Sequence, residues 1–130
     1  MVKCIYLFDF IVCMGGPQSA GSDINKYPYL VDEVDFLKSA LKAKIHVFGF
    51  YFGAQLIGRA LGASAERSPH KEIEIFPIEL KKEGRQDPLL AILPKKFAVA
   101  HWHSDMPGLT KTAVLAKSED CPRQIVRYLP

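Results

Sequence analysis

The sequence predicts an α/β fold, and two observations carry that prediction. In the first half, apolar runs at residues 10–14 and 45–50 alternate with helical patterns at 30–43 and 53–61, with short joins between them. Strand, helix, strand, helix in this order is typical of a parallel sheet with crossover helices. In the second half, apolar and charged residues alternate at 72–80, which indicates an antiparallel strand. We therefore expect a flavodoxin-like parallel sheet flanked by helices, with an antiparallel extension.

The two apolar runs of the first half are continuous, so both strands are expected to be buried on both faces. The first helix presents one apolar face at spacings of four, three and four residues. That face is formed by Leu30, Val34, Leu37 and Leu41. The second helix is expected to stop at Gly62. Its inward residues are predicted to be Leu56, Ile57, Ala60 and Leu61.

In the second half, Glu72 and Glu74 fall on the face of the strand that we expect to be solvated. Pro77 places this strand near a sheet edge. Residues 81–87 read as a polar loop, and Asp87 is expected to cap a short helix that begins at Pro88. Further strands are predicted at residues 97–102, 113–116 and 124–129.

Composition limits the classes of function. A chain of 130 residues with 48% hydrophobic residues predicts one domain, residues 1–130, with a real core. The net charge is +3 without a basic stripe, so a nucleic-acid partner is not expected. Three cysteines are an odd number, which favours a reducing, cytoplasmic location. The apolar run from Cys4 to Met14 contains Asp9 and reads as a core strand rather than a signal peptide. No run reaches membrane-spanning length, so no membrane partner is expected.

The segment "VFGFYFGAQLIGRALGA", residues 47–63, has the layout of a nucleophile elbow. A sharp turn from strand to helix projects one side chain into a cleft and aims backbone N–H groups at an oxyanion. Gly49 and Gly53 would let the strand and the helix pass closely. The tip of the turn, where Cys or Ser is expected, is occupied by Tyr51.

Several motifs in the right order resemble the class I glutamine amidotransferases over roughly residues 8–128. "GFYFGAQLIGRALG" is similar to the family's elbow, in which Gly-x-Cys-x-Gly-x-Gln opens the turn. "FDFIVCMGGPQSA" resembles the strand that leads into its Gly-Gly-Pro loop. The segments "YPYL", "SPHKEIEIFPIEL", "AVAHWHSDMPGL" and "EDCPRQIVRY" follow in the family's order. They fit best the branch that is similar to the amidotransferase domain of GMP synthase.

The resemblance implies a role for each matching position. The nucleophilic cysteine of the family falls on Tyr51, and the oxyanion-hole N–H groups fall on Phe52 and on the loop of Gly15 and Gly16. The glutamine-binding Gln falls on Gln55. The segment that frames the amino-acid end of the substrate falls on His103, Ser104 and Asp105, where the branch usually has Gly in place of Ser104.

The family's catalytic His and Glu belong to a His-Pro-Glu motif that would follow Tyr128, and its first strand and helix would precede Phe10. Neither is found in this sequence, so we expect a domain that is incomplete at both ends. The family hydrolyses the side-chain amide of glutamine through a cysteine thioester and passes the ammonia to a synthetase. We expect this chain to be incompetent in that reaction and to need no cofactor or metal. Without these flanking elements, sheet edges would be left unpaired and apolar surface uncovered, which predicts a homo-oligomer.

Two alternatives remain. The chain could be a non-catalytic binding or regulatory module that uses the former cleft for glutamine or a related small molecule. His101 and His103 would share a face of a strand and could bind a metal with Asp105, although no third ligand has supporting spacing. Cys13 and Cys121 stand on no elbow and are expected to be inert.

Overall fold

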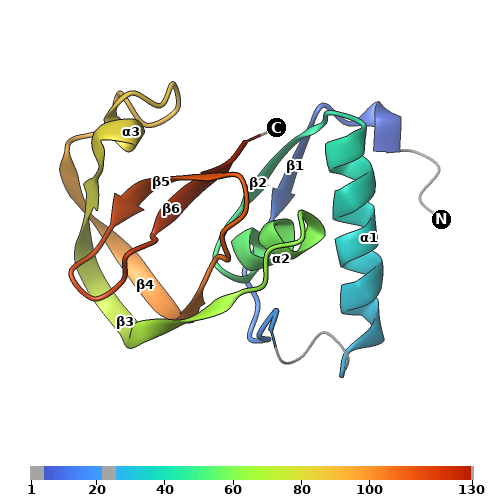
Figure 1. Cartoon of the computed structure of the whole chain (residues 1–130), viewed down its shortest axis with the longest axis horizontal. Helices are drawn as coiled ribbons and strands as arrows, with labels where there is room; N and C mark the ends of the chain where they lie inside the picture. The colour runs from blue at the N-terminus through green and yellow to red at the C-terminus, as the bar shows by residue number, and fades with distance from the viewer. Residues whose placement is uncertain (1–4, 22–25, 130) are drawn as a thin grey trace. The chain divides into compact units, whose positions relative to one another are not determined.

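The computed structural model describes residues 5–21 and 26–129, which leaves Cys4 outside the described residues. The chain divides into two compact units, Met1–Ala65 and Glu66–Pro130, and each is described by itself. The first contains a two-stranded parallel sheet with two helices, and the second a four-stranded antiparallel sheet (Figure 1). The predicted fold class, a parallel sheet with helices and an antiparallel extension, is therefore confirmed. Within residues 5–21 and 26–129, no helix is both long and apolar enough to cross a membrane.

The first unit begins with a short 3-10 helix, Ile5–Leu7, and its sheet pairs β1 (Phe10–Cys13) with β2 (His46–Gly49) in parallel. Burial alternates along both strands: Ile11 and Val47 are half-buried, whereas Val12 and Phe48 are exposed. The expectation that both faces are buried is thus wrong. Successive side chains of a strand point to opposite faces, and only one face of this pair is shielded.

Helix α1 (Pro28–Lys42) starts with Pro28 in its first turn, where the missing N–H costs nothing. Leu30, Val34 and Leu37 are buried as predicted, but Ala40 rather than Leu41 completes the buried face. Leu41 lies one residue before the end of the helix and is half-buried.

Helix α2 (Phe52–Ala60) buries Leu56 and Ile57 as predicted. Leu61, predicted to face inward, is instead exposed, because the helix has already ended at Ala60. The chain turns at Gly62, whose φ of +87° favours glycine. The Gly62 N–H donates to Arg59 O at 3.0 Å and the Ala63 N–H donates to Gly58 O at 2.9 Å, which is the Schellman pattern.

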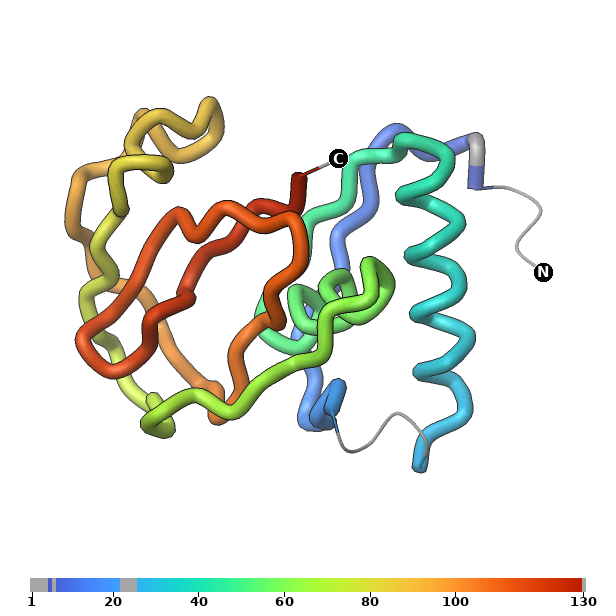
Figure 2. Tube along the Cα trace, viewed as in Figure 1, coloured from blue at the N-terminus to red at the C-terminus, as the bar shows by residue number. Residues whose placement is uncertain are grey.

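The second unit orders its strands β4-β3-β5-β6. The long pair β3 (Glu66–Leu80) and β4 (Lys96–Met106), and the hairpin of β5 (Thr112–Lys117) and β6 (Ile125–Tyr128), can be followed in Figure 2. Both β3 and β4 extend beyond the predicted bounds. Among the described residues, β5 pairs with β3 only at Glu79 and Leu80, so Pro77 lies where β3 is paired on one side, as predicted.

Apolar side chains from several strands form the core of the second unit. Its fully buried members are Ile78, Leu80 and Ala116, and the half-buried Leu90, Phe97, Val99 and Ile125 pack against them. The predicted polar loop contains a helix, α3 (Lys82–Arg85), that contacts β5. At Gly84 the backbones come so close that a Cβ would lie 2.1 Å from the Leu115 carbonyl oxygen.

Asp87 caps the turn that follows α3. Its Oδ1 accepts the Leu89 N–H at 2.9 Å, as predicted for a cap, and the segment forms turns rather than a helix. The buried carboxylate also accepts the Arg127 Nη2–H at 2.7 Å and the Nε–H at 2.5 Å. The Arg127 hydrogen bonds lower the pKa of Asp87, against the opposing effect of burial. This pair therefore ties the turn to β6.

The Asp87→Asn variant is expected to destabilise the second unit at neutral pH by about 1–2 kcal/mol, in the range of hydrogen bonds to charged groups, with Arg127 partly exposed. Because the folded pKa of Asp87 is lowered, its contribution is present above the unfolded value near ~3.9 and is lost as the pH falls through the folded pKa. Urea unfolding of both proteins between neutral and acidic pH measures the difference. A destabilisation that does not shrink in acid would contradict this assignment. Glu79→Gln, which breaks a pair on the surface, is the control.

Candidate functional site

The strand β2 runs through Phe50 into Tyr51, and α2 starts at the next residue. Tyr51 has φ 50° and ψ −115°, a conformation that side chains with a Cβ rarely adopt. Tyr51 is 43% exposed, so the tip of the turn is open to solvent. The sequence prediction of a sharp strand-to-helix turn with Tyr51 at its tip is therefore confirmed.

Two glycines allow this turn to form. A Cβ on Gly49 would lie 2.6 Å from the Ala54 nitrogen, and one on Gly53 would lie 2.2 Å from the Cys13 carbonyl oxygen. Both neighbours are backbone atoms, which cannot rotate aside. The close approach of β2 and α2 that Gly49 and Gly53 predicted is therefore present.

The Gly-Gly loop after β1 lies against the elbow. A Cβ on Gly15 would be 3.3 Å from the Tyr51 Cβ, and one on Gly16 would be 3.4 Å from the Phe52 Cδ1. The loop is joined to α1 because the Gln18 amide donates to the Tyr29 hydroxyl at 2.7 Å. The structure thus brings the four predicted oxyanion and nucleophile positions into one place, at the N-terminus of α2.

Gln55 lies one turn along α2, and its backbone N–H donates to the Tyr51 carbonyl at 3.3 Å. Its side chain is buried, and its Oε1 atom has no hydrogen-bond partner among the described residues. A buried amide oxygen without a donor costs free energy, so the position has an unused acceptor close to the elbow.

Cys13 lies beside this turn, and its backbone carbonyl accepts the Phe50 N–H at 2.9 Å. Burial raises the pKa of the Cys13 thiol, and the charge of Glu33 raises it further. Because the thiolate is the reactive form, a raised pKa supports the prediction that Cys13 is inert. Cys121 is fully buried.

The other predicted substrate-binding residues, His103, Ser104 and Asp105, lie on β4 in the second unit. Asp105 accepts a hydrogen bond from Arg67 at 3.0 Å. His103 Nε2 lies 2.9 Å from the Glu72 Oε2. Their roles in glutamine binding stay predictions, because they belong to a different unit from the elbow.

Glu72 is the residue that sequence reasoning misjudged. We expected a solvated face, but the Glu72 side chain is 3% exposed, whereas Ile73 and Ile75 on the opposite face are 42% and 75% exposed. The carboxylate accepts hydrogen bonds from the Ser118 hydroxyl at 2.6 Å and the Gln124 amide at 2.5 Å, which compensate for its burial.

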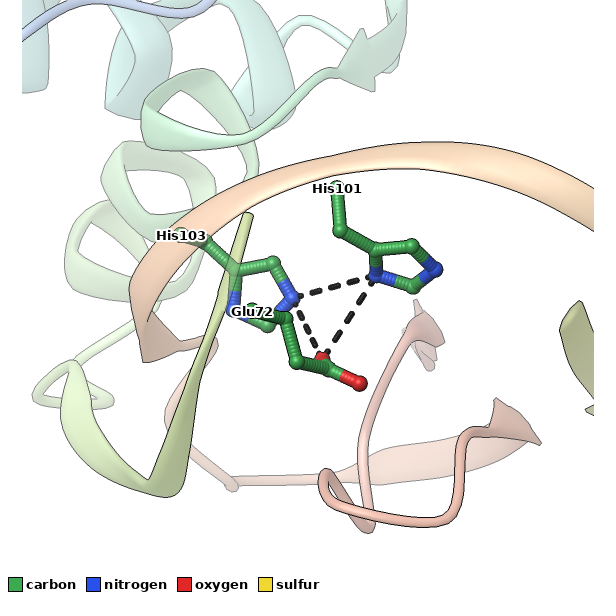
Figure 3. A group of neighbouring side chains, drawn as sticks. All are labelled: Glu72, His101 and His103. Carbon is green, nitrogen blue, oxygen red and sulfur yellow. Dashed lines mark hydrogen bonds and ion pairs between the residues drawn. The ribbon is translucent and has the colours of Figure 1, made fainter. Parts of the chain in front are cut away.

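Register explains what Glu72 contacts. In the antiparallel pair, Glu72 lies opposite His103 and Glu74 opposite His101. The side chains of Glu72, His101 and His103 point toward one another (Figure 3). The local sequence does not mark this register, in which Glu79 lies opposite Lys96 at the closed end of the pair. Asp105, which we had considered as the third metal ligand, pairs with Arg67 instead.

Replacing Tyr51 tests the strain at the elbow. Tyr51→Gly is expected to be more stable than Tyr51→Ala by about 1–2 kcal/mol, because only glycine adopts a positive φ without a penalty. Both variants lose the same ring, so their difference isolates the backbone. Urea unfolding followed by far-ultraviolet circular dichroism measures it, since α1 and α2 belong to this unit. Equal stability, or a more stable alanine variant, would mean that the turn is relaxed.

Comparison with known proteins agrees with this geometry. The model of the family "Glutamine amidotransferase class-I" matches residues 3–126. The glutamine amidotransferase-like protein YfeJ of Salmonella typhimurium is 47% identical over 124 residues, which are 93% of this chain and 52% of that protein. A GMP synthase of Thermosipho africanus is 29% identical over 119 residues, 90% of this chain and 21% of that enzyme. The crystal structure of SMU.1228c superposes with a TM-score of 0.91 at 42% identity, and covers all of this chain and 57% of the other.

The chain spans about half the length of YfeJ and a fifth of the GMP synthase. The family model, by contrast, covers nearly all of the chain, including the glycine loop, the elbow and both strands of the Glu72 cluster. The chain therefore belongs to the class I glutamine amidotransferase family.

Proposed function

We propose that this chain is a glutamine amidotransferase-like protein that does not hydrolyse glutamine. The observation that carries the proposal is the tyrosine at the tip of the elbow, the position that resemblance assigns to the nucleophilic cysteine. The family reaction forms a thioester between that cysteine and the side-chain acyl group of glutamine. A phenol cannot form a thioester.

The chemistry of tyrosine makes it a poor substitute. An unactivated phenol hydroxyl is a weak nucleophile. Tyr51 also fills space beside the glycine loop, since its Cβ and Cδ2 lie within 3.4 Å of where a Gly15 Cβ would be. The acyl group of a substrate would have to occupy the same region.

The purified chain is expected to release no ammonia from glutamine above a protein-free blank. Tyr51→Phe, which removes only the hydroxyl, should behave in the same way. A coupled assay for ammonia with glutamine in excess measures both. Release by the wild-type chain that disappears in Tyr51→Phe would show that the phenol acts as a nucleophile and would overturn the proposal.

A second candidate function is a binding or regulatory module that still recognises glutamine or a related small molecule. It is favoured by the unused acceptor on the buried Gln55, the position that resemblance assigns to glutamine binding. An amide oxygen of this kind could accept a hydrogen bond from the ammonium or amide group of an amino acid, which would relieve its desolvation penalty.

If this second function holds, calorimetry will detect binding of L-glutamine that weakens about tenfold in Gln55→Leu, the equivalent of one hydrogen bond. Gln86→Leu, at an exposed position of the second unit, is the matched control and should bind as the wild-type chain does. Absence of binding by the wild-type chain, or equal loss in both variants, would exclude a role for Gln55.

Association into a homo-oligomer and a cytoplasmic location remain predictions from the sequence. Some support for association comes from apolar side chains that neighbour one another on β3 and β4: Ile73 lies opposite Trp102, which is 76% exposed. Exposed apolar patches often mark interaction surfaces.

A further inference from the structure

Three potential metal ligands converge in the second unit, apart from the elbow. The Nδ1 of His101 lies 3.5 Å from the Nε2 of His103, and the Oε2 of Glu72 lies 3.5 Å and 2.9 Å from these two nitrogens (Figure 3). The ligands come from two paired strands, so the backbone ladder holds them in place. All three side chains are buried or nearly so.

These separations match the size of a transition-metal site. Zinc binds imidazole nitrogen and carboxylate oxygen at about 2.0–2.2 Å, so two ligands of a tetrahedral ion lie roughly 3.3 Å apart. The three observed separations bracket that value. Two imidazole ligands also favour a transition metal over Ca²⁺ or Mg²⁺, because those two ions prefer oxygen ligands.

The surrounding groups orient two of the three ligands, His101 and Glu72. His101 Nε2 lies 3.3 Å from the Phe76 carbonyl oxygen, which can only accept. In the tautomer of the neutral ring that donates to this oxygen, the Nδ1 lone pair faces the cluster. The hydrogen bonds from Ser118 and Gln124 fix the Glu72 carboxylate. Outer partners of this kind are a common feature of metal sites in proteins.

The charge balance around Glu72 also favours a bound cation. In the absence of a cation, the buried Glu72 carboxylate faces ring nitrogens of two histidines, at 3.5 Å and 2.9 Å. Among the described residues, the partners of the Glu72 carboxylate are hydroxyl, amide and imidazole groups, which carry no fixed positive charge. A divalent ion would supply that charge, and burying an anion beside it becomes favourable.

We propose that Glu72, His101 and His103 bind one divalent transition-metal ion of the zinc class, with the fourth position open to water. The ion would clamp β3 to β4 beyond the bulge between Arg67 and Glu72. The proposal is independent of glutamine chemistry at the elbow, since every ligand belongs to the second unit.

The test uses the full chain purified without a polyhistidine tag. The protein is stripped with a chelator, dialysed, and titrated with Zn²⁺ against a chromogenic competitor. We expect one ion per chain, and a loss of affinity of at least about tenfold in Glu72→Gln and in His103→Gln, since even outer-shell changes cost 10–100-fold. His70→Gln, an exposed histidine of the same strand, is the matched control and should bind normally.

A second measurement avoids variants that fail to fold. Zn²⁺ is added to the wild-type chain labelled with ¹⁵N, and the histidine ring nitrogens are recorded by NMR. We expect the two imidazoles to be metallated through different nitrogens, Nδ1 of His101 and Nε2 of His103. Failure of the stripped wild-type chain to bind one ion, or shifts confined to His46 and His70, would show that protons alone occupy the cluster and would overturn the proposal.

Discussion

The antiparallel unit is organised around one buried carboxylate. Glu72 loses its hydration in the fold, and such a loss is tolerated only where other groups replace the water. The replacements come from three directions: Ser118 and Gln124 lie beside β5 and β6, and the two histidines come from β4. Because each of them must reach the same two oxygens, the register of β3 against β4 and the course of residues 118–124 are linked. A further ion pair, Glu66 with Arg123, joins the same segment to the start of β3.

The elbow depends on a different constraint, the closeness of two backbones. Gly49 and Gly53 let the carbonyl of Cys13 and the start of α2 approach to distances that no Cβ would allow. The positive φ of Tyr51 then follows from the abrupt change of direction between β2 and α2. The geometry of a nucleophile turn thus persists with a side chain that is poorly suited to nucleophilic attack. Shape and reactivity are set by different residues, so one can be retained while the other is lost.

Much of the fold was predictable from local pattern. The two long helices, the elbow, the helix stop at Gly62 and the capping role of Asp87 depend on neighbours in sequence, and these predictions were confirmed. The short helix predicted at Pro88 forms turns instead, and α3 was predicted as a loop. The burial of β1 and β2 was not predictable, because a continuous apolar run does not reveal how many faces of the sheet are covered. The error at Glu72 has a related cause. Alternation of residues shows that a strand has two faces, but it does not show which face is buried. Polarity gives the wrong answer when a buried acid has hydrogen-bond partners that are distant in sequence. The partners of Glu72 lie 29 to 52 residues away.

Helix α3 has only one turn, but its residue Gly84 has no room for a methyl group. At Gly84 the carbonyl oxygen of Leu115 occupies the place of a side chain, and every other amino acid would introduce at least one carbon there. Relief would require β5 to move, and β5 is fixed by its pairing with β3 and β6. Any side chain at the centre of this short surface segment would therefore collide with backbone, whereas the neighbouring Lys81, Lys82 and Arg85 are exposed. In a population of related genes, Gly84 would behave like a core position despite its place in a connecting segment.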